Sequence, residues 1–190
     1  MRRGCFKVCL LVGCFLPAAF AATAQEVVHA LWGTVRSINS TAKTITVATD
    51  DGSEGLFQDF TKSNISLDFD KKIRAEATTA NAFTKNGVRV IVYYFGNSDE
   101  RTAVALQDLG SGPFEKSSGT VIKFHRNEHT LTLKNKSGTE ETFRLSPKSV
   151  AETAMGAVES YDLDLEVGDQ VRVTAAPVRG VETALFVRVM

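Results

Sequence analysis

Cysteine is scarce in this chain and is confined to its first residues. Cys5, Cys9 and Cys14 are the only cysteines among 190 residues. From residue 15 onward the chain therefore has no disulfide, no thiolate metal site and no cysteine nucleophile. Packing and hydrogen bonding must stabilise whatever fold this part adopts.

Methionine and tryptophan are almost as rare. The chain has three methionines and a single tryptophan, Trp32. Apart from Met1, the methionines are Met155 and the terminal Met190, and neither falls in a stretch with strand character. Because soft sulfur ligands select Cu(I), this composition disfavours a copper site built from histidine and methionines.

Neither sign of charge is in excess. The whole chain has 22 basic and 22 acidic residues, and residues 1–24 hold three of the basic ones and no acidic one, so the remainder carries a formal net charge of −3. A slightly acidic surface gives no electrostatic footprint for nucleic acid or an anionic membrane. The outward positions of the strand predicted at 44–49 are also short side chains without a stacking aromatic. We therefore expect no nucleic-acid partner.

The first 24 residues have the pattern of an export signal. A basic start is followed by an apolar run over residues 8–20 and by small residues up to Ala24. The run is shorter than the ~20 residues that span a bilayer, so we expect no transmembrane segment in the mature chain. We predict a signal peptide over 1–24, cleavage between Ala24 and Gln25, and export to a bacterial periplasm, where a disulfide-free exported protein fits well.

An alternative end to the signal is Cys14. The motif at residues 11–14 resembles the lipobox of bacterial lipoproteins, which would make Cys14 a lipidated N-terminus. Only about six apolar residues precede Cys14, whereas a signal core has roughly seven to fifteen. The core length therefore favours cleavage after Ala24.

An internal repeat is the strongest pattern in the chain. Short motifs return in order and at matched spacing: 33–35 with 119–121, 44–47 with 130–133, and 88–90 with 171–173. The first two pairs share an offset of 86 residues. Repetition of this kind predicts two copies of one structural unit. We assign residues 25–109 to the first unit, 110–114 to a linker and 115–190 to the second.

Each unit shows five stretches of β-branched and alternating apolar residues, which predict strands. They are 31–38, 44–49, 54–60, 88–95 and 102–107 in the first unit, and 119–124, 130–134, 141–145, 170–175 and 183–189 in the second. Five strands with a helix between the third and fourth is the order of an OB-like barrel. The predicted fold class is therefore all-β with one short helix per repeat, in two tandem five-stranded OB-like barrels. Small SH3-like barrels give similar patterns and remain an alternative.

Both helices are predicted from capping residues and spacing. In the first unit Asp70 can cap a helix that places four residues on one face: Ile73, Ala77, Ala80 and Phe83. In the second unit Ser146 followed by Pro147 is a strong helix start. Each unit has only about 75 to 80 residues, a size at which one core is marginal, so we expect the two barrels to pack on each other.

His125, Glu128 and His129 match the H-x-x-E-H motif of inverzincin metalloproteases. That motif needs a helix, where positions four apart share a face and reach one zinc. Here it lies between two predicted strands, and the equivalent residues 37–42 form a hairpin turn without histidine. We therefore interpret these histidines as solvated turn residues and predict neither an enzyme nor a metal site.

The short motifs G-x-V, T-I-T-V and a late V-x-V, spread over residues 31–190, resemble those of exported bacterial domains of unknown function. At the level of the fold, the chain is also similar to OB-fold periplasmic copper carriers. Those carriers use histidine, methionines and a nearby tryptophan as the metal site. This chain supplies Trp32 but no methionine on a strand, so the resemblance implies the fold without the metal site.

One difference between the repeats marks a candidate binding surface. Alternation places Ile91, Tyr93 and Phe95 outward on the fourth strand of the first unit, with Trp32 outward on the neighbouring first strand. The equivalent outward positions of the second unit are smaller or polar: Arg172, Thr174, Ala176 and Val178. An exposed apolar patch of this kind binds a ligand or partner, unless the second unit or Phe114 of the linker covers it.

These patterns predict an exported, non-catalytic binding or cell-envelope-associated module without a cofactor. Its partner is expected to be an envelope protein, a glycan or a small molecule. A periplasmic metal-ion carrier of the copper type is the alternative. No residue pattern identifies the ligand.

Overall fold

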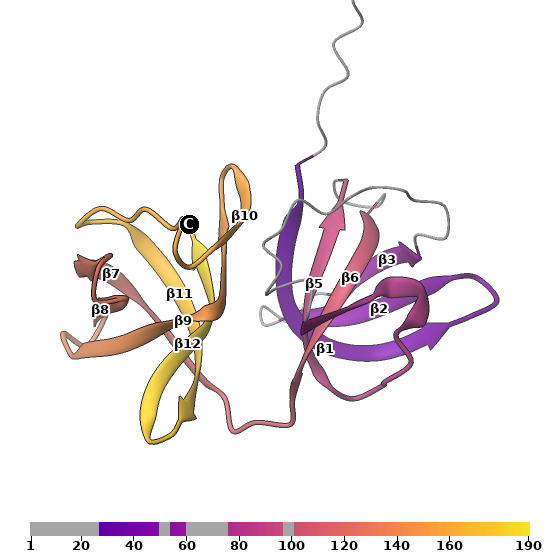
Figure 1. The fold of residues 1–190 in the computed structure, drawn as a ribbon, viewed down its shortest axis with the longest axis horizontal. Helices are drawn as coiled ribbons and strands as arrows, with labels where there is room; N and C mark the ends of the chain where they lie inside the picture. Colours follow the sequence, from indigo (N-terminus) through magenta and orange to yellow (C-terminus); the bar gives the residue numbers. More distant parts are fainter. Residues whose placement is uncertain (1–26, 50–53, 60–75, 97–100) are drawn as a thin grey trace, which may run out of the picture.

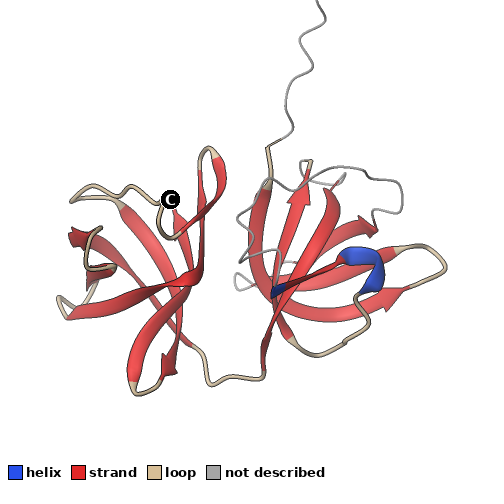
Figure 2. Ribbon diagram, viewed as in Figure 1, coloured by secondary structure: helices blue, strands red, loops and turns tan. Residues whose placement is uncertain are grey.

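The structure is a computed structural model, and it describes residues 27–49, 54–59, 76–96 and 101–190. These residues form two β-barrels in tandem, joined by a short linker (Figure 1). The predicted signal peptide, with its cleavage site at Ala24 and Gln25, lies outside the described residues. Strands dominate both halves, and the described helical structure is a single short turn (Figure 2).

The first barrel is a closed ring of five strands with a sixth strand at one edge. The ring contains β1 (His29–Asn39), β2 (Thr44–Thr49), β3 (Glu54–Asp59), β5 (Arg89–Phe95) and β6 (Arg101–Gly110). The order is β3-β2-β1-β5-β6, and parallel pairing between β3 and β6 closes the ring. The short strand β4 (Ala77–Thr79) pairs with β6.

The five-stranded ring of the second barrel repeats that of the first. It contains β7 (Glu115–His125), β8 (Thr130–Asn135), β9 (Glu140–Thr153), β11 (Gln170–Val178) and β12 (Val181–Val189). The ring closes through the β8–β9 pair, and the parallel pair is β9 with β12. β10 (Gly156–Glu159) extends β9 as a hairpin. The predicted pair of five-stranded barrels is thus confirmed, and this strand order is consistent with OB-like small barrels.

The repeated glycine motif has a steric cause. Gly33 and Gly119 occupy equivalent places in β1 and β7, where the neighbouring strand comes close. A Cβ at Gly33 would collide with the carbonyl oxygen of Ala48, and one at Gly119 with that of Lys134. Both strands then bulge two to four residues later, so the motif sets the curvature that closes each ring.

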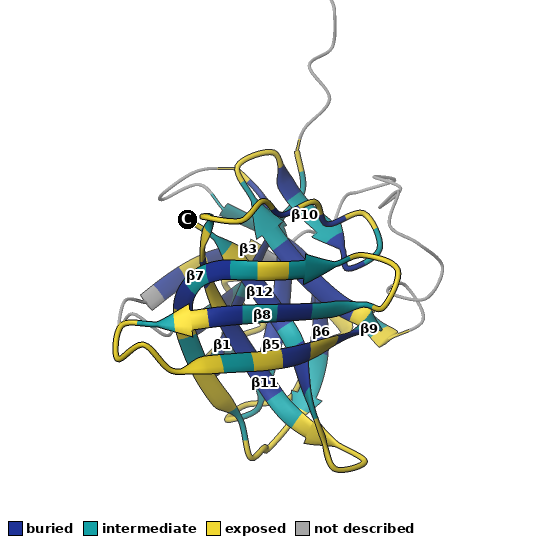
Figure 3. Ribbon diagram, turned by 90° about the vertical axis from the view of Figure 1, so that its left-hand side faces the viewer, coloured by how far each residue is buried: buried dark blue, intermediate teal, exposed yellow. Residues whose placement is uncertain are grey.

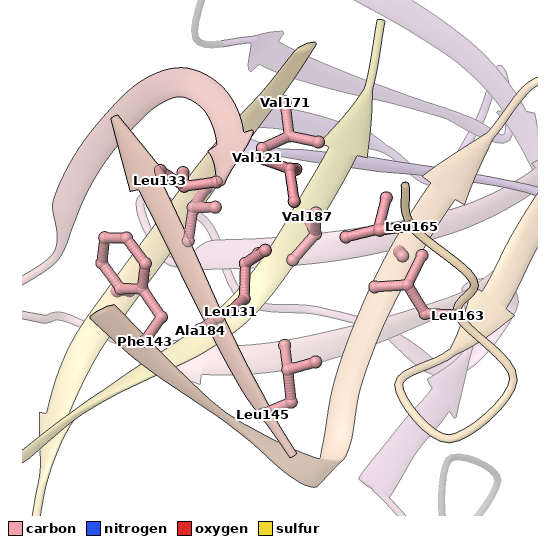
Figure 4. Close-up of a cluster of buried hydrophobic side chains, with 13 residues drawn as sticks. Val121, Leu131, Leu133, Phe143, Leu145, Leu163, Leu165, Val171, Ala184 and Val187 are labelled. Carbon is pink, nitrogen blue, oxygen red and sulfur yellow. The ribbon is translucent and has the colours of Figure 1, made fainter. Parts of the chain in front are cut away.

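Each barrel has its own apolar core, formed by alternate residues of its strands. Ile45 and Val47 of β2 are fully buried, as are Leu131 and Leu133 of β8. Figure 3 shows buried positions alternating with more exposed ones along β8. In the second barrel, side chains from all five ring strands meet in one cluster, which includes Phe143 (Figure 4).

Within the described residues, a short strand and one 3-10 turn stand where the helix of the first repeat was predicted. Asp70 and Ile73 lie outside the described residues, while Ala77 belongs to β4. A single 3-10 turn, η1 (Ala80–Ala82), follows, and its N-cap residue makes no side-chain capping hydrogen bond. Because β4 pairs with β6, the backbone hydrogen bonds there go to a sheet and not to a helix.

The helix predicted in the second repeat is wrong. Ser146 and Pro147 lie inside β9, which continues to Thr153. The Ser149 hydroxyl donates to the carbonyl oxygen of Ala184 at 2.5 Å and accepts from the Ser146 N–H at 2.8 Å. These bonds hold an irregularity in the β9–β12 pairing at this point, so the serines shape a bulge instead of capping a helix.

Candidate functional site

The predicted binding patch is buried between the two barrels. Trp32, Ile91 and Tyr93 are no more than 3% exposed and belong to a cluster separate from the core of the first barrel. Val150 and Phe186 of the second barrel complete this cluster. We call the cluster the seam; its buried members are Ala30, Trp32, Ile91, Tyr93, Ala105, Val150 and Phe186. Phe95, the fourth predicted residue, is also buried but lies outside the seam.

Polar contacts fix one barrel against the other at the edge of the seam. Glu152 of β9 accepts a hydrogen bond from the Ala30 N–H at 2.7 Å and lies 2.7 Å from Nδ1 of His29. Its burial raises the pKa of the Glu152 carboxyl above its ordinary value. The Ala157 N–H donates to the carbonyl oxygen of Val28 at 2.8 Å, which joins β10 to the chain leading into β1.

Phe114 of the linker is partly buried and packs against the seam. Its ring meets that of Trp32 edge to face, with centroids 4.9 Å apart. On the other side of the seam, the Tyr93 hydroxyl donates to Oε1 of Gln107 at 2.9 Å, and burial raises the pKa of this phenol. The linker is therefore part of the packed structure and not a loose tether.

A large cleft of about 1150 Å³ lies beside the linker, between the two barrels. One wall comes from the end of β6 and the linker, and the other from β9, β11 and β12. Its apolar lining includes Leu109, Pro113, Phe114, Pro177, Val178, Val181 and Leu185. Val178 and Val181 are both about half exposed, so the cleft has an apolar lip.

The charged side chains of the cleft leave an excess of positive charge. Glu76 and Lys148 form an ion pair of 2.6 Å that connects the two barrels across the cleft. Asp108 pairs with Lys85 at 2.6 Å, and that hydrogen bond holds the pKa of the Asp108 carboxyl below its ordinary value.

Two cationic side chains of the cleft have no such partner in the described part of the chain. Arg144 and Arg179 are exposed and form no ion pair with any residue that the structure describes. The cleft is thus locally positive on a chain that, beyond residue 24, is slightly acidic.

Two tight turns of the second barrel bring His129 and Arg179 to the cleft. The β7–β8 turn ends at His129, whose φ of 52° is left-handed, and His129 stacks edge to face on Tyr161 with centroids 4.5 Å apart. The β11–β12 turn consists of Arg179 and Gly180, both with positive φ. In barrels of this order, the loops joining strands one to two and four to five are those that OB folds use for ligands.

The histidine motif lies where the sequence placed it, in a β-hairpin. His125 ends β7 and His129 directly precedes β8, so the two do not share a helical face. Within the described part of the chain, no three His, Cys, Asp or Glu side chains gather in a way that could hold a metal ion. His129 instead contributes its ring to the wall of the cleft.

No protein-family profile matches the chain, and no curated protein sequence matches it significantly. No helix in the described ranges is long and apolar enough to span a membrane. Function must therefore be argued from the geometry of the cleft.

Sequence reasoning singled out His129 and Phe114, which line the cleft, but missed its two arginines. Arg144 and Tyr161 belong to no motif, and the cleft forms from segments of both barrels. For Arg179 the available signal was the Arg179-Gly180 pair, because it marks a tight turn between two strands.

Proposed function

We propose that this protein is an exported, non-catalytic binding module whose ligand lies in the cleft between the barrels. The observation that carries the proposal is the pairing of an apolar wall with two arginines that no described acidic group neutralises. Such a surface fits an elongated ligand with an apolar body and at least one acidic group. The pattern of residues 1–24 supports export, and the partner is then a component of the cell envelope.

The size of the cleft supports a small-molecule or short-chain ligand. Ligand pockets measure roughly 300–1,000 Å³, and the cleft, at about 1150 Å³, lies just above that range. The seam holds the two walls in place before a ligand arrives. Preorganised walls reduce the entropy that binding would otherwise cost.

Each part of the lining has a defined role in this proposal. The guanidinium groups of Arg144 and Arg179 present planar sets of donors that match carboxylate, sulfonate or phosphate oxygens. Phe114, Val178 and Val181 provide the apolar contact. Phe114 also contacts Trp32, so a ligand that shifts this ring changes the surroundings of the single tryptophan.

Titration with anilinonaphthalene sulfonate (ANS) tests the proposal, because this probe combines an apolar aromatic body with one anionic group. We expect saturable binding with an increase in probe fluorescence. Arg144→Gln and Arg179→Gln should each weaken binding roughly three- to tenfold, the effect of losing one charge-assisted contact at a partly exposed site.

Arg36→Gln is the matched control, since Arg36 is an exposed arginine of β1 that does not line the cleft. It should bind ANS as the wild type does. Equal affinity in all four proteins, at unchanged thermal stability, would contradict the proposal.

A further inference from the structure

A second, smaller pocket opens on the seam and shares no lining residue with the cleft. Its volume is about 50 Å³. Trp32 of the first barrel lines one side, and Arg172 and Arg188 of the second barrel line the other. The pocket therefore combines two positive charges with the single tryptophan of the chain.

The two arginines lie side by side on neighbouring strands, although their like charges repel each other. Arg172 of β11 and Arg188 of β12 are directly opposite in the antiparallel pairing. Like charges in this relation destabilise a sheet. Neither arginine forms an ion pair with a residue in the described ranges.

The carboxylate opposite Arg188 is already engaged. Glu152 lies opposite Arg188 on the next strand, β9. Its two oxygens contact Nδ1 of His29 and the N–H of Ala30, both at 2.7 Å and both on the first barrel. Glu152 thus serves the contact between the barrels and acts on Arg188 only through space. One carboxylate cannot neutralise two guanidinium groups, so at least one positive charge is left to another anion.

Trp32, which lines this pocket, also carries a donor without a partner in the described residues. Its indole Nε1 is buried and has no hydrogen-bond partner among the described residues. An indole N–H can only donate, so what it lacks is an acceptor. Buried donors in native structures are almost always paired, with protein, water or ligand.

The volume of the pocket limits the acceptor to a small group. One water occupies about 10–15 Å³ of such a volume, so the pocket, at about 50 Å³, holds roughly three to five atoms of that size. A tetrahedral oxyanion has four oxygens, and paired guanidinium groups bind such oxygens through parallel N–H donors.

We propose that this pocket binds a tetrahedral oxyanion, phosphate or sulfate, between Arg172, Arg188 and Trp32. The arginines belong to the second barrel and the tryptophan to the first, so the bound anion bridges the seam. It removes the repulsion between the arginines and accepts from the indole N–H. A ligand that binds only the docked, folded state also stabilises that state by mass action.

The test is a titration of the full chain with inorganic phosphate at constant ionic strength, balanced with sodium chloride. Trp32 fluorescence reports binding within the pocket, and the thermal midpoint reports stabilisation. We expect a saturable change in emission and a rise of several degrees in Tm, with sulfate acting similarly. A response that chloride or acetate reproduces at the same ionic strength would overturn the proposal.

Variants locate the response. Arg172→Gln and Arg188→Gln should each abolish it or weaken it at least tenfold, while Arg36→Gln, which removes a charge elsewhere, should leave it intact. Trp32→Phe keeps an aromatic ring but removes the donor, and calorimetry should show weaker phosphate binding by several-fold. Phosphate binding that persists unchanged in both arginine variants would place the anion elsewhere and overturn the proposal.

Discussion

Replacing Phe186 by alanine should separate the contribution of the seam from that of the two barrel cores. Phe186 belongs to the second barrel, is 5% exposed and packs in the seam, outside the core cluster of its own barrel. Truncating a buried phenylalanine costs about 3–5 kcal/mol through lost transfer energy and the cavity that remains. The seam lies between two separately folded units, which can shift toward each other and close part of that cavity, so we expect the lower end, about 3 kcal/mol.

This loss converts into a measurable change in melting temperature. For a protein of about this size, 1 kcal/mol shifts Tm by roughly 2–4 °C, so Phe186→Ala should lower Tm by about 6–12 °C. The folded variant should also show red-shifted emission from Trp32, because water reaches the seam once Phe186 no longer fills it. Thermal melts followed by circular dichroism and by tryptophan fluorescence measure both effects.

Leu131→Ala is the matched control. Leu131 is fully buried in the core of the second barrel and is not part of the seam. It should cost a similar 2–5 kcal/mol but leave the emission of folded Trp32 unchanged. The reasoning is refuted if Phe186→Ala changes Tm by less than about 2 °C and leaves the emission maximum where it was.

Three further substitutions test other parts of the structure. Burial raises the folded-state pKa of Glu152 above its usual 4.5. The contribution of this carboxyl group to stability is therefore complete below pH 4.5 and is lost as pH rises through the folded-state pKa. The Tm of Glu152→Gln minus that of the wild type should increase with pH, and a difference that stays constant would count against this explanation. Gly156→Val should lower Tm and shift Trp32 emission to the red, because Gly156 has a φ of 106° and a Cβ there would collide with Val27 and Val28. An unchanged melting curve would argue against this close approach. Gly119→Ala should destabilise by about 1 kcal/mol or more through its collision with Lys134, and equal denaturation midpoints would contradict the steric account.

The barrels could be predicted because their information is local and repeated. Ile45 and Val47 alternate with threonines in β2, and Leu131 and Leu133 do so in β8. Such alternation fixes a strand and its buried face without knowledge of the rest of the fold. Both repeats show the same series of predicted strands, so each supports the strand assignment of the other.

The helix in the second repeat was predicted wrongly because Ser146-Pro147 has two local uses. A serine followed by proline starts a helix when the next carbonyl groups bond along the chain. Here the hydroxyl groups of Ser149 and Ser160 bond across the barrel, to the carbonyl oxygens of Ala184 and Ser146. Which carbonyl oxygen each hydroxyl group bonds depends on strands that are distant in sequence, so the local sequence pattern does not predict it.

The sites were harder to predict than the fold because docking creates them. Trp32 and Tyr93 stood out as a bulky apolar stripe, and the structure buries both in the seam. Arg144 and Arg179 looked like ordinary surface residues, yet the linker and β6 face them across the cleft. Which surfaces meet is a property of two folded units, so the sequence pattern of either unit does not specify it.

The central claim is that the cleft between the docked barrels is the ligand site. Two-dimensional NMR of the isotope-labelled protein, titrated with ANS, tests this claim most directly. We predict shift changes concentrated at residues that line the cleft, including Phe114, Arg144, Tyr161 and Arg179, with β2 on the first barrel unaffected. Changes confined to β2, or none at saturating probe, would contradict it.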